Sequence, residues 1–288
     1  MSVLSATGAG VRHHRRWLVR DLDLVVEAGE TVAVVGPPGS GRTSTLLMLA
    51  RRLRSSAGQV VLSGAAGLGQ VSGVNDPEPV FTVREHVQER LALLGRHRRE
   101  TASVPLHGLD PELRGRDLTP YQKQVLGLVL AGLARPAVIA LDGVDAGLDT
   151  RERSELWRLL GSLAADGLAV LVTAREVDPA LVSRVVRLSD PQAGDAGRAV
   201  VQTPSEYATS VSAALPHPAP AAPAPAAPAS AAPAPGETEA SPAERRTVRE
   251  KRLRKAGKTA GKRHRRKPTP NTTTMSRPRR TAGKRGQR

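Results

Sequence analysis

Short runs of β-branched and aliphatic residues alternate with longer helical patterns along the N-terminal two thirds of the chain. The predicted strands are Thr31–Val35, Gln59–Leu62, Ala137–Leu141, Ala169–Thr173 and Arg184–Leu188. The predicted helices are Ser40–Leu53, Val83–Leu94, Pro120–Ala134 and Arg151–Ala165. The runs at 31–35 and 137–141 are apolar at nearly every position, which is typical of strands buried on both faces. The pattern therefore predicts an α/β fold with a mostly parallel sheet and helices on both of its sides.

Charge divides the chain into two parts. Residues 1–210 hold 24 lysines and arginines against 23 acidic residues, whereas residues 211–288 hold 19 against 4. Nearly all of the net charge of +16 therefore lies in the C-terminal part, which excludes a uniformly basic nucleic-acid-binding domain. We predict a folded domain over 1–210, an Ala/Pro-rich linker over 211–240 and a basic tail over 241–288.

The C-terminal part has a composition that disfavours a packed core. Residues 213–236 contain 8 prolines and 12 alanines, which predicts a semi-rigid polyproline II spacer. Residues 245–288 hold all 19 basic residues of this part and no aromatic residue, which predicts disorder. Three interpretations of the tail stay open: a solvated polycation without a partner, an anchor on anionic lipid, or an arm that binds nucleic acid.

Composition also excludes several classes of site. The chain has no cysteine, so disulfides, thiol catalysis and cysteine-ligated zinc are excluded. Five aromatic residues in all predict an aliphatic core and no platform on which bases stack. No apolar run approaches the roughly 18 residues that a membrane span needs, and no apolar N-terminal signal is seen. We therefore expect a cytoplasmic protein.

A glycine-rich octet joins the predicted strand at 31–35 to the helix that follows. Positions 36–43 read Gly-Pro-Pro-Gly-Ser-Gly-Arg-Thr, which fits the phosphate-loop pattern G-x-x-x-x-G-[K/R]-[ST]. Glycines let the backbone wrap a phosphate, and the amides and dipole of the helix N-terminus attract it. The residues expected to hold phosphate are Gly36, Gly39, Ser40, Gly41, Arg42 and Thr43, with the Thr43 hydroxyl also expected to ligate Mg²⁺.

The octet departs from the usual motif at two positions, and a plain alternative exists. Arg42 stands where lysine is the rule, and its planar guanidinium does not move along the phosphates as a compact ammonium does. Pro38 removes one amide donor. The alternative is a structural glycine turn before a helix, which is common in α/β proteins.

Motifs further along the chain resemble those of the nucleotide-binding cassette of ABC transporters. Asp142 follows an apolar strand, as a Walker B aspartate does, and Ala146–Asp149 is similar to the D-loop. Leu118–Leu126 occupies the place of the signature L-S-G-G-Q-x-Q, and Gln122 matches its first glutamine. The resemblance implies that Asp142 joins Thr43 around Mg²⁺ and that Gln122 contacts nucleotide.

The resemblance covers about residues 10–208. Gln202–Tyr207 is similar to the closing G-T-P-x-E of the family. The fold that it implies is a P-loop NTPase with a mostly parallel sheet, a helical signature subdomain at about 75–135, and ATP and Mg²⁺ as cofactors.

Five positions depart from the family pattern where hydrolysis and nucleotide contact need particular side chains. Gly143 and Ala174 occupy the places of the catalytic glutamate and the switch histidine, so no catalytic residue is assigned with certainty. Gly73 falls where a count of nine back from Thr82 puts the Q-loop glutamine. The two signature glycines are replaced by Pro120 and Tyr121.

No single residue of the sequence stands out as the aromatic contact for adenine. The family uses an aromatic side chain before its first strand, and His13, His14 or Trp17 are candidates. The preferred interpretation places both histidines in a solvated basic arm and Trp17 over the core.

These observations imply the ATP-binding subunit of an ABC-type membrane transporter whose own hydrolysis is impaired or absent. Loss of one positioned base or hydrogen-bond donor lowers the reaction rate by a factor of about 10²–10⁴. The expected partners are a permease on a separate chain and a second, competent cassette, with the protein at the inner face of the membrane. The alternative is a regulatory or scaffold protein that dimerises through the cassette fold and binds nucleic acid through its tail.

The charge distribution predicts where polyanions bind. A chain that ends at Ser210 should keep its affinity for MgATP and lose binding to anionic vesicles and to DNA, because net positive charge is concentrated after that residue. Binding by the full chain should fall steeply with salt and show no preference for one DNA sequence. Co-sedimentation with vesicles and a DNA mobility shift at two salt concentrations measure this. Retained binding by the shortened chain would place the polyanion site in the folded domain.

Overall fold

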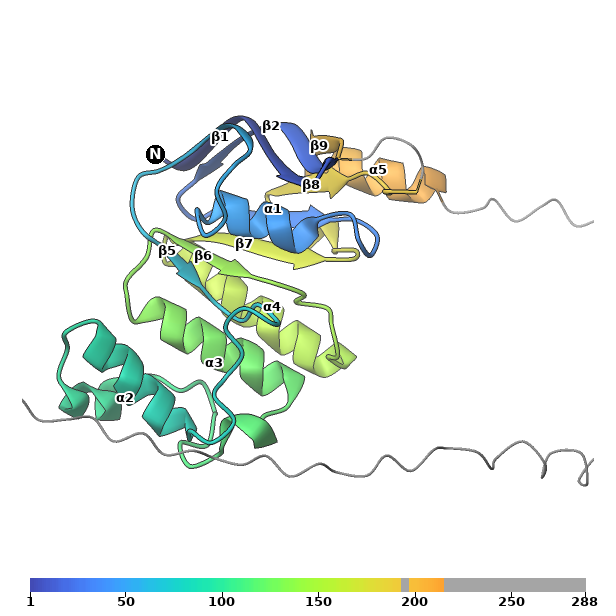
Figure 1. The fold of residues 1–288 in the computed structure, drawn as a ribbon. Coiled ribbons are helices and arrows are strands. Elements are labelled where there is room, and N and C mark those ends of the chain that lie inside the picture. The colour runs from blue at the N-terminus through green and yellow to red at the C-terminus, as the bar shows by residue number, and fades with distance from the viewer. Residues whose placement is uncertain (193–196, 215–288) are drawn as a thin grey trace, which may run out of the picture. The chain divides into compact units, whose positions relative to one another are not determined.

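The computed structural model describes residues 1–192 and 197–214, and its largest feature is a six-stranded sheet (Figure 1). The strand order is β5-β6-β7-β3-β8-β9. These strands are β3 (Thr31–Val35), β5 (Ala66–Leu68), β6 (Val138–Leu141), β7 (Ala169–Ala174), β8 (Arg184–Leu188) and β9 (Ala199–Gln202). Neighbours are parallel from β5 to β8, and β9 is antiparallel to β8. The prediction of a mostly parallel sheet is confirmed.

A second, antiparallel sheet has the order β2-β1-β4. It consists of β1 (Ser2–His13), β2 (Arg16–Glu27) and β4 (Ala57–Leu62). The predicted strand at 59–62 therefore exists, but it pairs with β1 rather than with the parallel strands. The sequence did not predict β1, because Gly8, Gly10 and several register shifts interrupt its alternation of apolar and polar positions.

The expected basic arm is the turn of the β1–β2 hairpin. His13 and His14 are exposed there, as expected. Trp17 is half-buried, with the guanidinium carbon of Arg12 5.7 Å from its ring centroid. A Cβ at Gly10 would lie 3.1 Å from the Trp17 ring, so the indole packs on the hairpin backbone.

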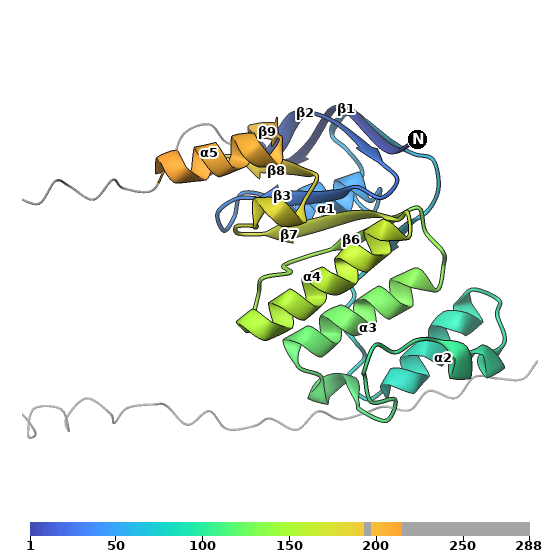
Figure 2. The same cartoon turned by 180° about the vertical axis from the view of Figure 1, so that it is seen from behind.

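Helices cover both faces of the six-stranded sheet, as predicted (Figures 1 and 2). The helix α1 (Arg42–Leu49) lies between the two sheets, where residues of β1, β2, β3 and α1 form one apolar core. The helices α3 (Pro120–Gly132) and α4 (Thr150–Ala165) lie on the other face. There Leu156 and Leu160 of α4 are fully buried in a second core.

The region predicted as a helical subdomain contains α2 (Val83–Leu93), two 3₁₀ helices (Arg98–Ser103 and Gly115–Asp117) and α3. These pack around two small apolar clusters. Capping boxes at Thr82 and Thr119 start α2 and α3, and a third at Asp149 starts α4. The helices consequently begin within one residue of their predicted positions.

The described chain ends in α5 (Pro204–Ala214), which follows the short 3₁₀ helix Pro179–Leu181 and the strand β9. This helix continues past residue 210, so the shortened chain in the polyanion experiment should end after Ala214 instead. Most of the predicted linker and all of the predicted tail lie outside the described residues. Within 1–192 and 197–214, no helix combines the length and apolarity that crossing a membrane requires.

Candidate phosphate and magnesium site

The phosphate loop lies between β3 and α1, at the carboxyl end of the parallel strands. Gly39 and Gly41 have φ angles of 80° and 94°, a region that favours glycine. A Cβ on Gly36 would lie 2.8 Å from the Ser40 hydroxyl, and one on Gly41 would lie 3.0 Å from Leu18. These positions explain the glycines at 36, 39 and 41.

Polar groups of the loop are left available at the start of α1. The first helical hydrogen bond runs from the Thr45 amide to the Gly41 carbonyl at 2.8 Å, so the amides of Arg42 and Thr43 precede it. The Ser40 hydroxyl is buried and has no hydrogen-bond partner among the described residues. A buried hydroxyl without a partner is costly, and a phosphate oxygen would satisfy it. The residues present therefore fit a phosphate group.

The structure brings Thr43 and Asp142 together, as the motifs predicted. The Thr43 hydroxyl donates to the Asp142 carboxylate, at 2.9 Å from Oδ2 and 3.1 Å from Oδ1. No group of three or more histidine or acidic side chains in the described residues could hold a metal by itself. A single carboxylate with a hydroxyl fits Mg²⁺, which keeps most of its ligands as water and phosphate.

Thr173, near the end of β7, was not predicted as part of the site. Its hydroxyl donates to Asp142 Oδ1 at 2.5 Å and accepts the Gly143 amide at 2.8 Å. Thr173 is 1% exposed. In the sequence it looks like any β-branched residue of a buried strand, so no pattern singles it out.

Two glutamines contact the backbone of Asp142. Gln124 of α3 donates to the Asp142 carbonyl at 2.9 Å, and its own Oε1 has no partner among the described residues. The carbonyl of Gln70, just after β5, accepts the Asp142 amide at 3.0 Å. Both side chains are buried.

The glutamine nearest to Asp142 at this edge of the sheet is Gln70, three positions before Gly73. Gly73 is exposed and has no side chain, whereas Gln70 contacts Asp142 through its main-chain carbonyl. The Gln70 side chain donates to Asp76 at 2.7 Å, and Asp76 in turn accepts the Gly73 amide at 2.7 Å. The count of nine back from Thr82 reaches Gly73 in this turn, three positions after the glutamine of the same segment.

The positions expected to drive hydrolysis carry no functional side chain. Gly143 has a φ of 62°, a left-handed conformation, and Ala174 is 1% exposed at the end of β7. Asp145, the nearest following carboxylate in the sequence, accepts the Arg175 amide at 2.9 Å. That contact directs one of its oxygens to the backbone after β7.

The start of the signature helix is poor in free amide donors. Pro120, the first residue of α3, has no amide hydrogen. The Gln122 amide donates to the Thr119 hydroxyl at 3.2 Å, and Gln122 Oε1 accepts the Thr119 amide at 2.9 Å. Both contacts of Gln122 therefore stay within its own helix cap. Burial raises the pKa of the Tyr121 phenol, and the Glu155 carboxylate raises it further, so this ring is packed against α4.

Known proteins are similar to this chain in sequence and in fold. The ABC transporter family profile matches residues 19–144. The aliphatic sulfonates import ATP-binding protein SsuB 1 of Rhodococcus jostii is 32% identical over 196 residues, which cover 65% of this chain and 79% of that protein. The chain belongs to the ABC transporter family.

Other relatives differ in length from this ABC protein. SCO2324 of Streptomyces coelicolor, described as an ABC transporter ATP-binding protein, is 32% identical over 71% of this chain, but the match spans only 40% of that relative. The structure of cbiO1 from Clostridium perfringens, part of the ABC transporter complex cbiONQ, superimposes with a TM-score of 0.60 at 16% identity. That match covers 75% of this chain and 96% of cbiO1, and it confirms the P-loop cassette fold.

The Thr173 hydroxyl should be important for stability as well as for the site. We expect Thr173→Val to lower the free energy of unfolding by about 1–3 kcal/mol, because it leaves the Gly143 amide without its partner and removes the shorter of the two hydrogen bonds to Asp142 Oδ1. Thr173→Ser keeps the hydroxyl and should lose less. Urea unfolding measures both variants. Equal stability of Thr173→Val and the unmodified protein would show that the hydroxyl is not needed.

Proposed function

We propose that this chain is the ATP-binding subunit of an ABC membrane transporter and acts with a permease on a separate chain. The observation that carries the proposal is the Thr43–Asp142 pair beneath a glycine loop whose Ser40 hydroxyl lacks a partner. Family membership supports it, and SsuB 1 is named as an import ATP-binding protein. A subunit of this kind would lie in the cytoplasm, at the inner face of the membrane.

The phosphates of ATP would be held by residues 36–43, and Thr43 and Asp142 would hold Mg²⁺. When bound, Mg²⁺ supplies positive charge at the phosphate oxygens. The amides of Arg42 and Thr43 lie at the N-terminus of α1, where the helix dipole also favours an anion. Arg42 is half-buried and has no side-chain partner in the described part of the chain, so its guanidinium is available to the phosphates.

We also infer that the chain's own hydrolysis is impaired. Glycine at 143 and alanine at 174 provide neither a base for water nor an imidazole. The cap of α3 uses the Gln122 amide internally, and Pro120 offers none, which weakens the signature that would face a second cassette. A competent cassette is therefore the partner that this chain would need for turnover. The predicted linker would begin after α5 and run to residue 240, and residues 241–288 would be a tail.

MgATP should bind while steady-state hydrolysis stays negligible. Isothermal titration measures binding and a phosphate-release assay measures turnover, both on the full chain. Turnover near the ordinary enzyme range of about 1–10³ per second would contradict the proposal. Thr43→Val should weaken MgATP binding, because it removes the hydroxyl that faces Asp142.

A restoring pair tests the assignment of the two missing side chains. Gly143→Glu with Ala174→His should raise any residual rate, whereas Gly143→Gln with Ala174→His is the matched control without a base. Both pairs strain residue 143, because a φ of 62° costs a non-glycine residue about 1–2 kcal/mol. The hydrolysis rates of the two double variants are therefore compared with each other rather than with that of the unmodified chain. Equal rates for the two would show that residue 143 is not the position of the base.

The chain should not form an ATP-driven homodimer. Two copies would give two composite sites, each with the proline-started α3 facing the other's phosphate loop. Sedimentation velocity with and without MgATP decides this. A clear shift from monomer to dimer on adding MgATP would contradict the inferred weakness of the signature.

A further inference from the structure

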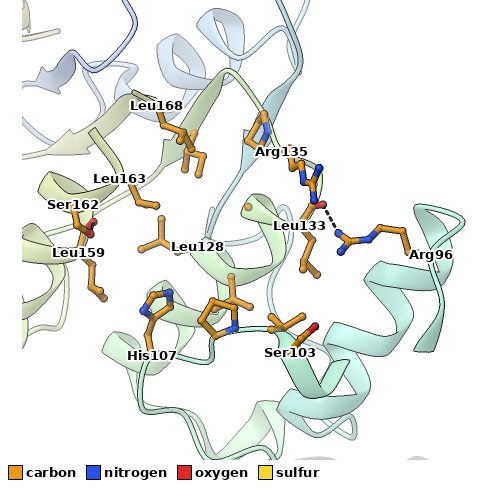
Figure 3. Close-up of a pocket in the computed structure, with 16 residues that line it drawn as sticks. Arg96, Ser103, His107, Leu128, Leu133, Arg135, Leu159, Ser162, Leu163 and Leu168 are labelled. Atoms are coloured by element: carbon orange, nitrogen blue, oxygen red, sulfur yellow. Dashed lines mark hydrogen bonds between the residues drawn. The ribbon is translucent and has the colours of Figure 1, made fainter. Parts of the chain in front are cut away.

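A pocket of about 450 Å³ lies between α3, α4 and the segment at 103–107, and none of the residues of the phosphate loop line it (Figure 3). Its wall is mostly aliphatic. Leucines come from three places: Leu128 of α3 with Leu133 just after that helix, Leu159 and Leu163 of α4, and Leu168 before β7. Small-molecule sites commonly have volumes of about 300–1,000 Å³ and walls of this kind with few polar groups.

The ionisable side chains that line the pocket are all basic. They are Arg96, His107 and Arg135, and no aspartate or glutamate lines it. An apolar wall with arginine guanidinium groups complements an organic anion with a hydrocarbon body, whereas a cation of the same shape would be repelled. The pocket therefore has a chemical preference as well as a shape.

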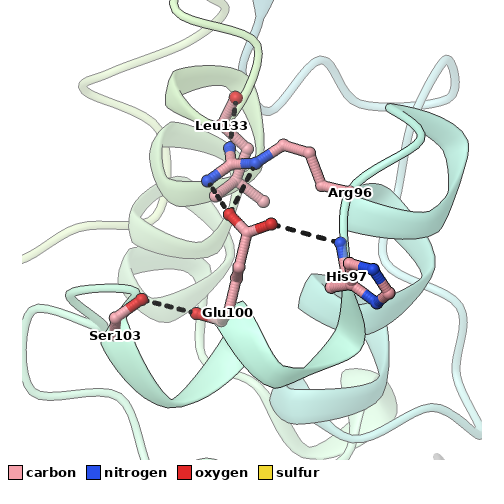
Figure 4. Close-up of polar contacts among 5 residues, drawn as sticks. All are labelled: Arg96, His97, Glu100, Ser103 and Leu133. Carbon is pink, nitrogen blue, oxygen red and sulfur yellow. Dashed lines mark hydrogen bonds and ion pairs between the residues drawn. The ribbon is translucent and has the colours of Figure 1, made fainter.

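The side chain of Arg96 makes hydrogen bonds that hold one wall of the pocket in place (Figure 4). Its Nη1 donates to the Leu133 carbonyl at 2.9 Å, and its Nε donates to the Glu100 carboxylate at 2.9 Å. The other Glu100 oxygen accepts the His97 amide at 3.1 Å, and the Ser103 hydroxyl donates to the Glu100 carbonyl at 2.8 Å. The hydrogen bond from Arg96 holds the pKa of Glu100 below its usual value, so this link between the 3₁₀ helix and α3 stays ionised.

Arg135 and His107 differ from Arg96, because their side chains make no such contacts within the described residues. Both are exposed, and neither side chain has a hydrogen bond or ion pair among the residues that the structure describes. Both also have a left-handed backbone, with φ angles of 48° and 51°. Non-glycine residues in this conformation are uncommon and are found preferentially at functional sites. Two of them line this one pocket.

The geometry points to a binding site for a small amphipathic organic anion, with the hydrocarbon part among the leucines and the anionic group held by Arg135. This site is separate from the nucleotide site and does not depend on the proposed transport function. The ligand class follows from three observations: the wall is aliphatic, its ionisable side chains are all basic, and the Arg135 guanidinium has no partner among the described residues.

Decanoate is the probe, titrated into the full chain by calorimetry below its micelle concentration, with decanol as the neutral probe of equal length. We expect saturable binding of decanoate to one site and at least tenfold weaker binding of decanol. Arg135→Asn keeps a residue that tolerates the left-handed backbone and removes the charge. It should reduce the preference for decanoate over decanol at least threefold. Absence of saturable decanoate binding, or an unchanged preference in Arg135→Asn, would overturn the proposal.

Two glycines give a matched steric test. Gly132 of α3 lines the pocket, and Gly161 of α4 is exposed and does not line it. A Cβ at either position would meet no atom within 4 Å, and neither glycine has a positive φ. Gly132→Leu should lower decanoate affinity at least tenfold, and Gly161→Leu should leave it unchanged.

Circular dichroism with thermal unfolding checks that each variant is folded, and Gly132→Ala is the smaller replacement if Gly132→Leu is not. It should weaken decanoate binding less than Gly132→Leu. Equal decanoate affinity of a folded Gly132 variant and the unmodified chain would place the anion elsewhere. Equal losses in the Gly132 and Gly161 variants would also overturn the assignment.

Discussion

Four elements of the cassette meet at Asp142, and the arrangement of the site depends on the hydrogen bonds made there. The Thr43 hydroxyl from α1 and the Thr173 hydroxyl from β7 bind its carboxylate. Its carbonyl accepts Gln124 of α3, and its amide donates to Gln70 after β5. Because the four partners come from different parts of the fold, hydrogen bonds to this one residue hold α1, β7, α3 and the segment after β5 next to one another. Hydrogen-bond networks inside a protein specify the relative positions of the elements that they join.

In this arrangement the groups that hold the site together are not the side chains that hydrolysis would need. The fold needs the hydroxyls and amides around Asp142, but it needs no side chain at 143 and only a methyl group at 174. Gly143 contributes through its amide, which donates to Thr173, and its left-handed φ suits glycine. A chain of this kind can therefore lose a base and an imidazole while it keeps its phosphate loop. The inferred loss of turnover is compatible with an intact cassette for this reason.

The sequence predicted the parts whose signal is local. The apolar patterns predicted β3 and the starts of α2, α3 and α4 within a residue, and the motifs predicted that Thr43 and Asp142 belong to one site. Parts that depend on distant pairing were missed. The strand β1 is interrupted by glycines and pairs with both β2 and β4. Thr173 was missed because it belongs to no motif and looks like any other β-branched residue of a buried strand.

The central claim is that this cassette holds nucleotide through residues 36–43 and Asp142 without converting it. The most direct measurement is the identity of the nucleotide that stays with the full chain after long incubation with MgATP at 25 °C, followed by rapid desalting, denaturation and chromatography of the released nucleotide. The account predicts intact ATP in amounts that fall when Asp142→Asn removes the carboxylate charge. Recovery of mostly ADP with released phosphate from the unmodified chain would contradict it.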